Sequence, residues 1–191
     1  MSFTELDTAY MARAIELAKQ GRFTTTPNPN VGCVLVKDGE IVGEGFHQLA
    51  GQGHAEVNAL AVAGDNAKGA TAYVTLEPCS HYGRTPPCAE GLKAAGVSKV
   101  IAAMVDPNPA VSGRGLQILA DAGISVASGL LEQQARDLNK GFLKRMESGL
   151  PYVTCKMACS LDGKTALNNG QSKWITGPKA RQDVQAFRAQ S

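Results

Sequence analysis

Hydrophobic and polar positions along residues 1–149 switch repeatedly between helical and strand spacing. Apolar side chains recur at helical intervals within 4–20, which predicts an amphipathic helix that ends at Gly21. Short continuous apolar runs predict strands at 31–36, 41–46, 72–76, 99–105 and 124–127. Helical spacing predicts further helices at 54–64, 88–95, 115–122 and 130–147.

The order of these elements predicts the fold class. Asp38 and Gly39 separate the first two predicted strands, and this pair favours the tight turn of an antiparallel hairpin. Beyond the hairpin, strands and helices alternate, which is typical of a largely parallel sheet with helices on both faces. We therefore expect an α/β domain with a mixed sheet in three α/β/α layers, ending near Gly149.

Composition narrows the classes of partner. The chain has 19 Lys and Arg against 17 Asp and Glu, and only 5% of its residues are aromatic. Sequence-independent binding to nucleic acid needs a clustered basic face with stacking aromatics. We therefore expect a small-molecule substrate and no nucleic-acid partner.

The N-terminus and the cysteines bear on the cellular compartment. Charged residues interrupt the segment where a signal peptide would lie, and no apolar run approaches the roughly 18 residues of a membrane span. Cys33, Cys155 and Cys159 lie in strand-like apolar stretches, where we expect reduced packing residues. We therefore expect a soluble cytoplasmic protein without a membrane partner.

Two short segments supply ligands that suit a zinc ion. His54, Cys79 and Cys88 offer one imidazole and two thiols, and a catalytic zinc keeps three protein ligands with one position open to water. Glu56 lies two residues after His54, close enough to act as the catalytic acid and base without binding the metal. An H-x-E motif followed by P-C is the signature of zinc-dependent base deaminases.

The second half of this motif departs from the usual spacing. Cys79 and Cys88 are separated by eight residues rather than two. A longer loop can still return both sulfurs to one ion, because the cost of loop closure grows slowly with length. The alternatives are that both cysteines are buried packing residues, or that His81 completes a closed structural zinc site.

Two further segments are candidate substrate contacts. Residues 24–32 are rich in proline and asparagine, which excludes regular structure just before a predicted strand. Asn28 there is explained as well by turn formation as by ligand binding. His47, on the loop before the predicted metal helix, is explained equally by a substrate contact or by a surface position. The chain contains no Gly-x-Gly-x-x-Gly or Walker motif.

Five segments together give the sequence a family resemblance. They are P-N-P-N-V-G-C, H-A-E, T-L-E-P-C-S-H-Y-G-R-T-P-P-C, D-P-N-P-x-V-x-G-R-G at 106–115 and N-K-G-F at 139–142. With them the chain resembles the bifunctional deaminase/reductase family of riboflavin biosynthesis, within the cytidine-deaminase-like superfamily. The H-A-E and P-C motifs mark only the superfamily, whereas the long cysteine segment is much more specific.

The resemblance implies a substrate and residues that contact it. The implied reaction is hydrolytic removal of the 2-amino group of 2,5-diamino-6-ribosylamino-4(3H)-pyrimidinone 5′-phosphate. By similarity Asn28 and His47 contact the pyrimidine, and Arg84, with His81, lies near the substrate. A guanidinium at Arg84 also suits a phosphate or a ring carbonyl.

Residues 150–191 resemble the start of the family's second domain, a dihydrofolate-reductase-like reductase that uses NADPH. By that similarity Ala158 and Trp174 contact the cofactor, while Lys156, Ser172 and Arg188 contact substrate. Trp174 is equally explained as a core aromatic residue. We expect residues 1–149 to form the zinc-dependent deaminase domain and 150–191 an incomplete reductase domain, so that this chain catalyses only the deamination.

Two other functions compete with this interpretation. Within the same class of enzyme, the substrate could be cytidine or an adenosine in tRNA, although the long cysteine segment and the reductase-like tail speak against both. The other is a non-catalytic structural zinc module, which needs four closed ligands. The superfamily resemblance also implies a homo-oligomer.

Overall fold

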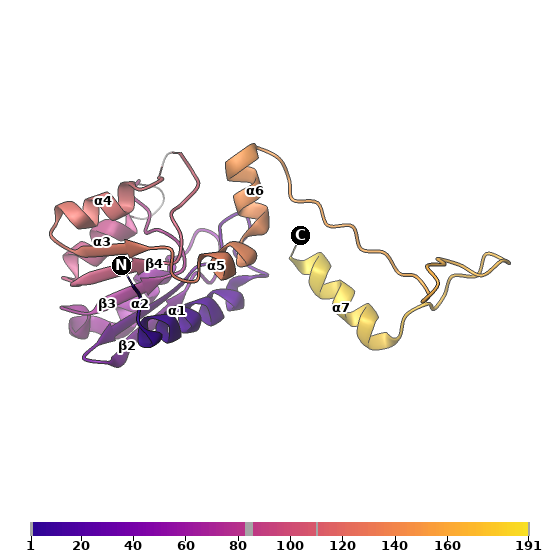
Figure 1. The fold of residues 1–191 in the computed structure, drawn as a ribbon, viewed down its shortest axis with the longest axis horizontal. Coiled ribbons are helices and arrows are strands. Elements are labelled where there is room, and N and C mark those ends of the chain that lie inside the picture. Colours follow the sequence, from indigo (N-terminus) through magenta and orange to yellow (C-terminus); the bar gives the residue numbers. More distant parts are fainter. Residues whose placement is uncertain (1, 83–85, 110, 191) are drawn as a thin grey trace. The chain divides into compact units, whose positions relative to one another are not determined.

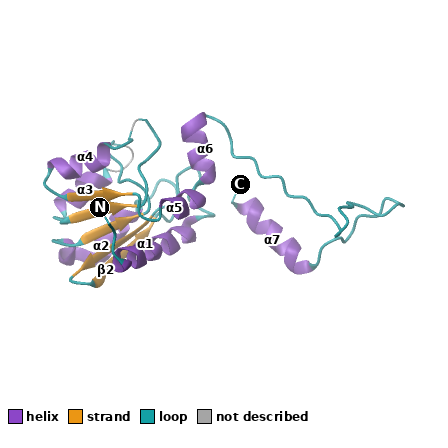
Figure 2. Ribbon diagram, in the orientation of Figure 1, coloured by secondary structure: helices purple, strands orange, loops and turns teal. Residues whose placement is uncertain are grey.

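The computed structural model describes residues 2–82, 86–109 and 111–190. These fall into two units, Met1–Pro151 and Tyr152–Ser191, which we describe separately. The first unit contains a five-stranded sheet in the order β2-β1-β3-β4-β5 (Figures 1 and 2). Its strands are β1 (Gly32–Lys37), β2 (Glu40–Phe46), β3 (Thr71–Val74), β4 (Lys99–Ala102) and β5 (Ser125–Ser128).

The sheet is mixed, as predicted. β1 pairs antiparallel with both β2 and β3, whereas β3, β4 and β5 run parallel to one another. Parallel neighbours end at the same edge of a sheet, so the segments that follow β3 and β4 lie side by side. These segments carry half of the residues that line the cavity described below.

Helices cover both faces of the sheet and complete the three predicted layers (Figure 2). One face packs against α1 (Glu5–Ala18), α5 (Glu132–Leu138) and α6 (Lys140–Ser148). The other packs against α2 (Ala55–Ala63), α3 (Cys88–Ala94) and α4 (Arg114–Asp121). Side chains alternate along β1 accordingly, since Val34 joins the first core and Leu35 the second.

The close packing of α2 on β2 depends on a glycine. A Cβ atom at Gly45 would lie 2.4 Å from the backbone nitrogen of Ala59 and 2.6 Å from the carbonyl oxygen of Ala55. These are backbone atoms of α2, which cannot move aside as a flexible side chain can. Gly45 therefore sets the approach of the helix that begins at the candidate metal ligand His54.

We expect Gly45→Ala to lower the free energy of unfolding by about 1–3 kcal/mol, the usual cost of overpacking a core. Urea denaturation followed by circular dichroism measures the change. Gly141→Ala is the matched control, because a Cβ there meets no atom within 4 Å and alanine favours a helix. Equal stability of the Gly45→Ala variant and the wild type would contradict this account of the packing.

Three predicted elements differ from the structure. The helix expected over 130–147 is two helices, because Asn139 leaves helical geometry at φ −123° and ψ 27° between α5 and α6. The expected strands 72–76 and 99–105 end earlier, at Val74 and Ala102, where the chain leaves the sheet.

The second unit contains helix α7 (Pro178–Ala189) and otherwise irregular chain. None of its described residues is buried. The prediction that Cys155 and Cys159 are packing residues is therefore wrong, since both are exposed, whereas Cys33 is buried in β1 as expected. Trp174 is 70% exposed and packs against the Arg181 guanidinium at 4.3 Å rather than in a core. Within the described part of the chain, no helix combines the length and apolar character of a membrane span.

Candidate metal centre and active site

Three predicted ligands converge in the structure. One ligand atom each from His54, Cys79 and Cys88 lie within 4.8 Å of one another. The Nδ1 atom of His54 is 3.2 Å from Sγ of Cys88 and 3.6 Å from Sγ of Cys79. Among the residues that the structure describes, His81 is not part of this group.

The local fold explains why the eight-residue gap does not separate the sulfurs. His54 is the N-cap of α2, Cys79 follows β3, and Cys88 is the first residue of α3. The backbone N–H of Cys88 donates to Sγ of Cys79 at 3.2 Å, and that of Ala89 donates to the Cys79 carbonyl. Both ends of the segment are thus tied together at the start of α3.

The geometry and chemistry of these donors suit zinc. For tetrahedral zinc with ordinary bond lengths, a nitrogen and a sulfur ligand lie about 3.5 Å apart, and the two distances from His54 bracket that value. The pKa of Cys79 is lowered to about 4, because Cys88 donates a hydrogen bond to its sulfur. A thiolate is the form of cysteine that binds a metal, so the site fits the ion.

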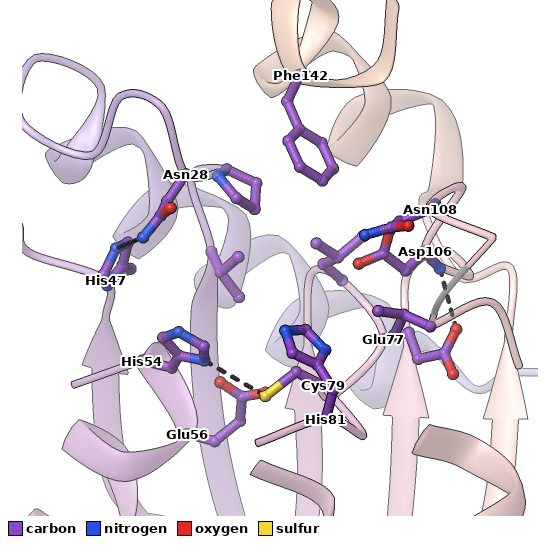
Figure 3. Close-up of a pocket in the computed structure, with 14 residues that line it drawn as sticks. Asn28, His47, His54, Glu56, Glu77, Cys79, His81, Asp106, Asn108 and Phe142 are labelled. Atoms are coloured by element: carbon purple, nitrogen blue, oxygen red, sulfur yellow. Dashed lines mark hydrogen bonds between the residues drawn. The ribbon is translucent and has the colours of Figure 1, made fainter. Parts of the chain in front are cut away.

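Glu56 lies on the first turn of α2, with its carboxyl group directed toward His54 and Cys79 (Figure 3). Its side chain is only 3% exposed. Burial raises the pKa of Glu56 to about 7, so that the carboxyl group can gain and lose a proton near neutral pH. This is the property that an acid and base in one reaction requires.

Two of the ligands, His54 and Cys79, line a cavity of about 200 Å³ together with Glu56. Figure 3 shows that side chains from segments far apart in the sequence face this space. The lining residues are Asn28, Pro29, Val31, His47, His54, Glu56, Leu76, Glu77, Cys79, His81, Asp106, Asn108, Val111 and Phe142. Three of the predicted substrate contacts, Asn28, His47 and His81, are therefore brought to one pocket.

Asn28 and His47 form a fixed polar pair in the pocket wall. Nδ1 of His47 lies 3.1 Å from the carbonyl oxygen of Gly53 and must donate to it, so Nε2 accepts from the Asn28 amide, also at 3.1 Å. Burial lowers the pKa of His47, which favours this neutral form. The arrangement leaves the amide oxygen of Asn28 to accept an N–H from a ligand.

The loop that carries Asn28 is held by the junction of α5 and α6. The backbone N–H of Asn30 donates to Oδ1 of Asn139 at 2.7 Å, and Nδ2 of Asn139 donates back to the Asn30 carbonyl at 2.9 Å. Arg145 also donates to the carbonyl of Pro27. The side-chain amide of Asn30 also donates to the backbone carbonyl of Leu138 at 3.2 Å, so a backbone acceptor at this junction is used outside the two helices.

We expect Asn139→Ala to lower the free energy of unfolding by about 1–3 kcal/mol, because it leaves buried backbone groups of Asn30 without partners. Asn139 is 4% exposed, so water cannot readily replace the lost amide. Chemical denaturation measures the loss, with Asn66→Ala on the exposed surface as the control. A change no larger than that of the control would show that the pairing does not stabilise the loop.

Of the eight lining residues that were not predicted as site residues, four are polar or aromatic: Glu77, Asp106, Asn108 and Phe142. The sequence could have indicated all four, because each belongs to a segment that gave the family resemblance. Helical and strand spacing indicated nothing about them, because they lie where β3 and β4 have ended or on the pocket-facing side of α6.

The remaining predicted site residues stay predictions. Arg84 lies outside the residues that the structure describes. The five residues predicted to bind reductase ligands belong to the second unit, where Arg188 bonds to Gln185 at 3.3 Å. The five are Lys156, Ala158, Ser172, Trp174 and Arg188.

The α/β/α fold and the three-ligand centre define a cytidine-deaminase-like zinc protein. Residues 4–104 match the model of the cytidine and deoxycytidylate deaminase zinc-binding region, and the chain belongs to this family. Within it, the chain is 66% identical to the riboflavin biosynthesis protein RibD of Escherichia coli (strain K12) over 185 residues, which cover 97% of this chain and 50% of that protein. Residues 151–191 match the model of the RibD C-terminal domain.

A second sequence relative and a solved structure extend this comparison. A protein of Buchnera aphidicola subsp. Acyrthosiphon pisum, named diaminohydroxyphosphoribosylamino-pyrimidine deaminase, is 57% identical over 145 residues, covering 76% of this chain and 99% of that protein. The structure of Acinetobacter baumannii RibD, form 1, superposes with a TM-score of 0.94 at 62% identity, covering 98% of this chain and 52% of that one. The chain thus spans about half the length of the RibD proteins that it matches.

Proposed function

We propose that this chain catalyses the zinc-dependent hydrolytic deamination of 2,5-diamino-6-ribosylamino-4(3H)-pyrimidinone 5′-phosphate in riboflavin biosynthesis. The observation that carries the proposal is the buried Glu56 carboxyl group beside three converging metal ligands, two of which line the same cavity as Glu56. The choice of substrate is supported by the name of the Buchnera relative, which is matched over nearly its whole length.

His54, Cys79 and Cys88 would hold the zinc ion through Nδ1 and two sulfurs. When bound, zinc supplies a Lewis acid that makes water nucleophilic near neutral pH. Overall, water replaces the 2-amino group of the pyrimidine, and the products are a ring carbonyl and ammonia.

Glu56 moves the protons of this reaction. Its carboxylate accepts a proton from the attacking water and delivers it to the ring nitrogen beside the amine-bearing carbon. It then transfers the second proton to the leaving amine, which departs as ammonia. A pKa of about 7 lets one group act first as base and then as acid.

Asn28 and His47 would orient the pyrimidine. The amide oxygen of Asn28 is placed to accept an N–H of the ring or of its amine, while neutral His47 holds the amide in that orientation. His81 lines the same cavity. With Arg84 it would contact the ring carbonyl or the phosphate, for which a guanidinium is well suited.

For residues 150–191 we propose the beginning of an NADPH-dependent reductase domain, following a deaminase domain at 1–149. The match to the RibD C-terminal domain supports this division. In a full-length protein Ala158 and Trp174 would contact the cofactor, and Lys156, Ser172 and Arg188 the substrate. We propose that the reduction of the ribosyl group belongs to such a full-length protein, and that the working form is a homo-oligomer.

The test of the proposed function is ammonia release from three substrates by the zinc-loaded chain. The pathway pyrimidine is expected to give ammonia, whereas cytidine and adenosine-bearing tRNA are not. Faster release from cytidine or tRNA would assign another deaminase substrate. No release from any of them, with zinc bound, would favour a structural zinc module.

A further inference from the structure

Glu77 is a buried acid that the proposed chemistry does not use. It lies two residues before Cys79, just after β3, and is only 3% exposed. Burying a carboxylate is costly unless hydrogen bonds replace its water. The partners of Glu77 therefore indicate what it does.

The two carboxylate oxygens accept hydrogen bonds from four backbone N–H groups of the segment after β4. Oε2 accepts from Asp106 at 3.0 Å (Figure 3) and from Gly113 at 2.9 Å. Oε1 accepts from Gly115 at 2.8 Å and from Leu116 at 3.4 Å. Gly113 is the N-cap of α4, so Glu77 supplies the cap that this helix lacks from its own sequence.

The segment held in this way forms one wall of the cavity. Asp106, Asn108 and Val111 line the cavity between the points bonded to Glu77. Within the loop, Oδ1 of Asp106 accepts from the N–H of Asn108, and the carbonyl of Asn108 accepts from Val111. The position of this wall therefore depends on the Glu77 carboxylate at both of its ends.

The start of α4 also packs against the metal segment, residues 77–79, which carries the ligand Cys79. A Cβ at Gly115 would lie 1.9 Å from the carbonyl oxygen of Pro78, so the start of α4 packs directly on the residue before Cys79. Glu77 and Pro78 thus hold the wall at a fixed place relative to the metal ligands. The carboxylate suits this task because it is acceptor-only, whereas a glutamine would present an NH₂ group to N–H donors.

We propose that Glu77 is a positioning residue for substrate binding. Its carboxylate fixes the wall residues Asp106, Asn108 and Val111 against the metal segment, and so sets the distance between the reacting centre and the wall that contacts the rest of the substrate. This inference rests on the proposed deaminase function. Glu77 acts through the loop and not on the reacting atoms, which distinguishes it from Glu56.

The test is steady-state kinetics of Glu77→Gln, with zinc content measured on the same sample. We expect KM for the pathway pyrimidine to rise about 10- to 100-fold, the scale of lost hydrogen bonds to a buried charged group, while kcat changes less than about threefold. Zinc content should equal that of the wild type. Glu132→Gln, an exposed first-turn acid on α5, is the matched control and should leave KM unchanged.

A double variant tests whether Glu77 and Asp106 act on the same loop. The effect of the double variant Asp106→Asn with Glu77→Gln on KM should be smaller than the sum of the two single effects, because both changes act on one loop. Unchanged KM, loss of zinc, or a fall in kcat alone would overturn the proposal. If Glu77→Gln does not fold, Glu77→Asp replaces it with the same expectations.

Hydrogen exchange on the wild-type chain tests the same contact without any activity. The amides of Asp106, Gly113 and Gly115 should be protected to the level of the core strands. Rapid exchange at these positions would overturn the positioning role even if deamination is observed. Protection without deamination would instead contradict the proposed function while leaving the contact itself intact.

Discussion

Replacing Glu56 by glutamine is expected to abolish deamination while zinc remains bound. The change removes the group that takes and returns both protons, and such acid and base assistance is commonly worth ~10²–10⁴ in rate. The amide is close in shape to the carboxylate and does not alter the three ligands at His54, Cys79 and Cys88. Ammonia release and zinc content, measured on the same preparation, separate the loss of chemistry from the loss of metal.

The control for this variant is Glu90→Gln, an acid in the first turn of the neighbouring helix α3. Glu90 pairs with Lys93 at the surface, and an exposed pair contributes little. This variant should keep wild-type activity. Turnover by Glu56→Gln within a few-fold of the wild type would remove Glu56 from the mechanism.

Replacing Cys88 by alanine should remove both zinc and activity. Cys88 supplies one of three ligands from the first residue of α3, and its sulfur is 3.2 Å from Nδ1 of His54. Two remaining ligands hold a metal far less tightly, so a chelator that leaves the wild type loaded should strip this variant. Metal analysis by mass spectrometry after dialysis measures the loss.

Cys33 offers a matched control for Cys88, since both are buried cysteines without a disulfide partner. Cys33 lies in β1 and is not part of the ligand group in the described residues. Cys33→Ala should therefore retain zinc. Full zinc retention by Cys88→Ala would show that the three-ligand assignment is incorrect.

Sequence reasoning located the metal centre because its residues carry an uncommon combination of chemistry. An imidazole, two thiols and a nearby carboxylate at H-A-E and P-C have few joint explanations, although each residue alone has many. The strands and helices were likewise predictable from hydrophobic spacing, since they form one core on each face of the sheet. The resemblance then supplied Asn28, His47 and His81.

Hydrophobic spacing could not predict contacts between segments that are far apart in the chain. Glu77 bonds to backbone groups of residues 106–116, and backbone N–H donors leave no mark on side-chain identity. The pairing of Asn30 with Asn139 joins loop and helix junction across the fold. Helical spacing is continuous over 130–147 and therefore did not predict the break at Asn139. The side chain of this residue makes the tertiary contact with Asn30.

The expectation of packing cysteines in the tail failed for a related reason. Apolar spacing at 151–159 resembles a strand, but a strand forms only when a neighbour pairs with it. No strand of the second unit is found among its described residues. The cytoplasmic location and the homo-oligomer stay predictions.

The most direct measurement is an anomalous difference map at the zinc edge from crystals of the metal-loaded chain. The account predicts one strong peak within bonding distance of Nδ1 of His54 and the sulfurs of Cys79 and Cys88, with no fourth side chain and with Glu56 unbound beside it. A peak that is also ligated by His81 or by Glu56 would contradict it, because no open position would then remain for catalysis.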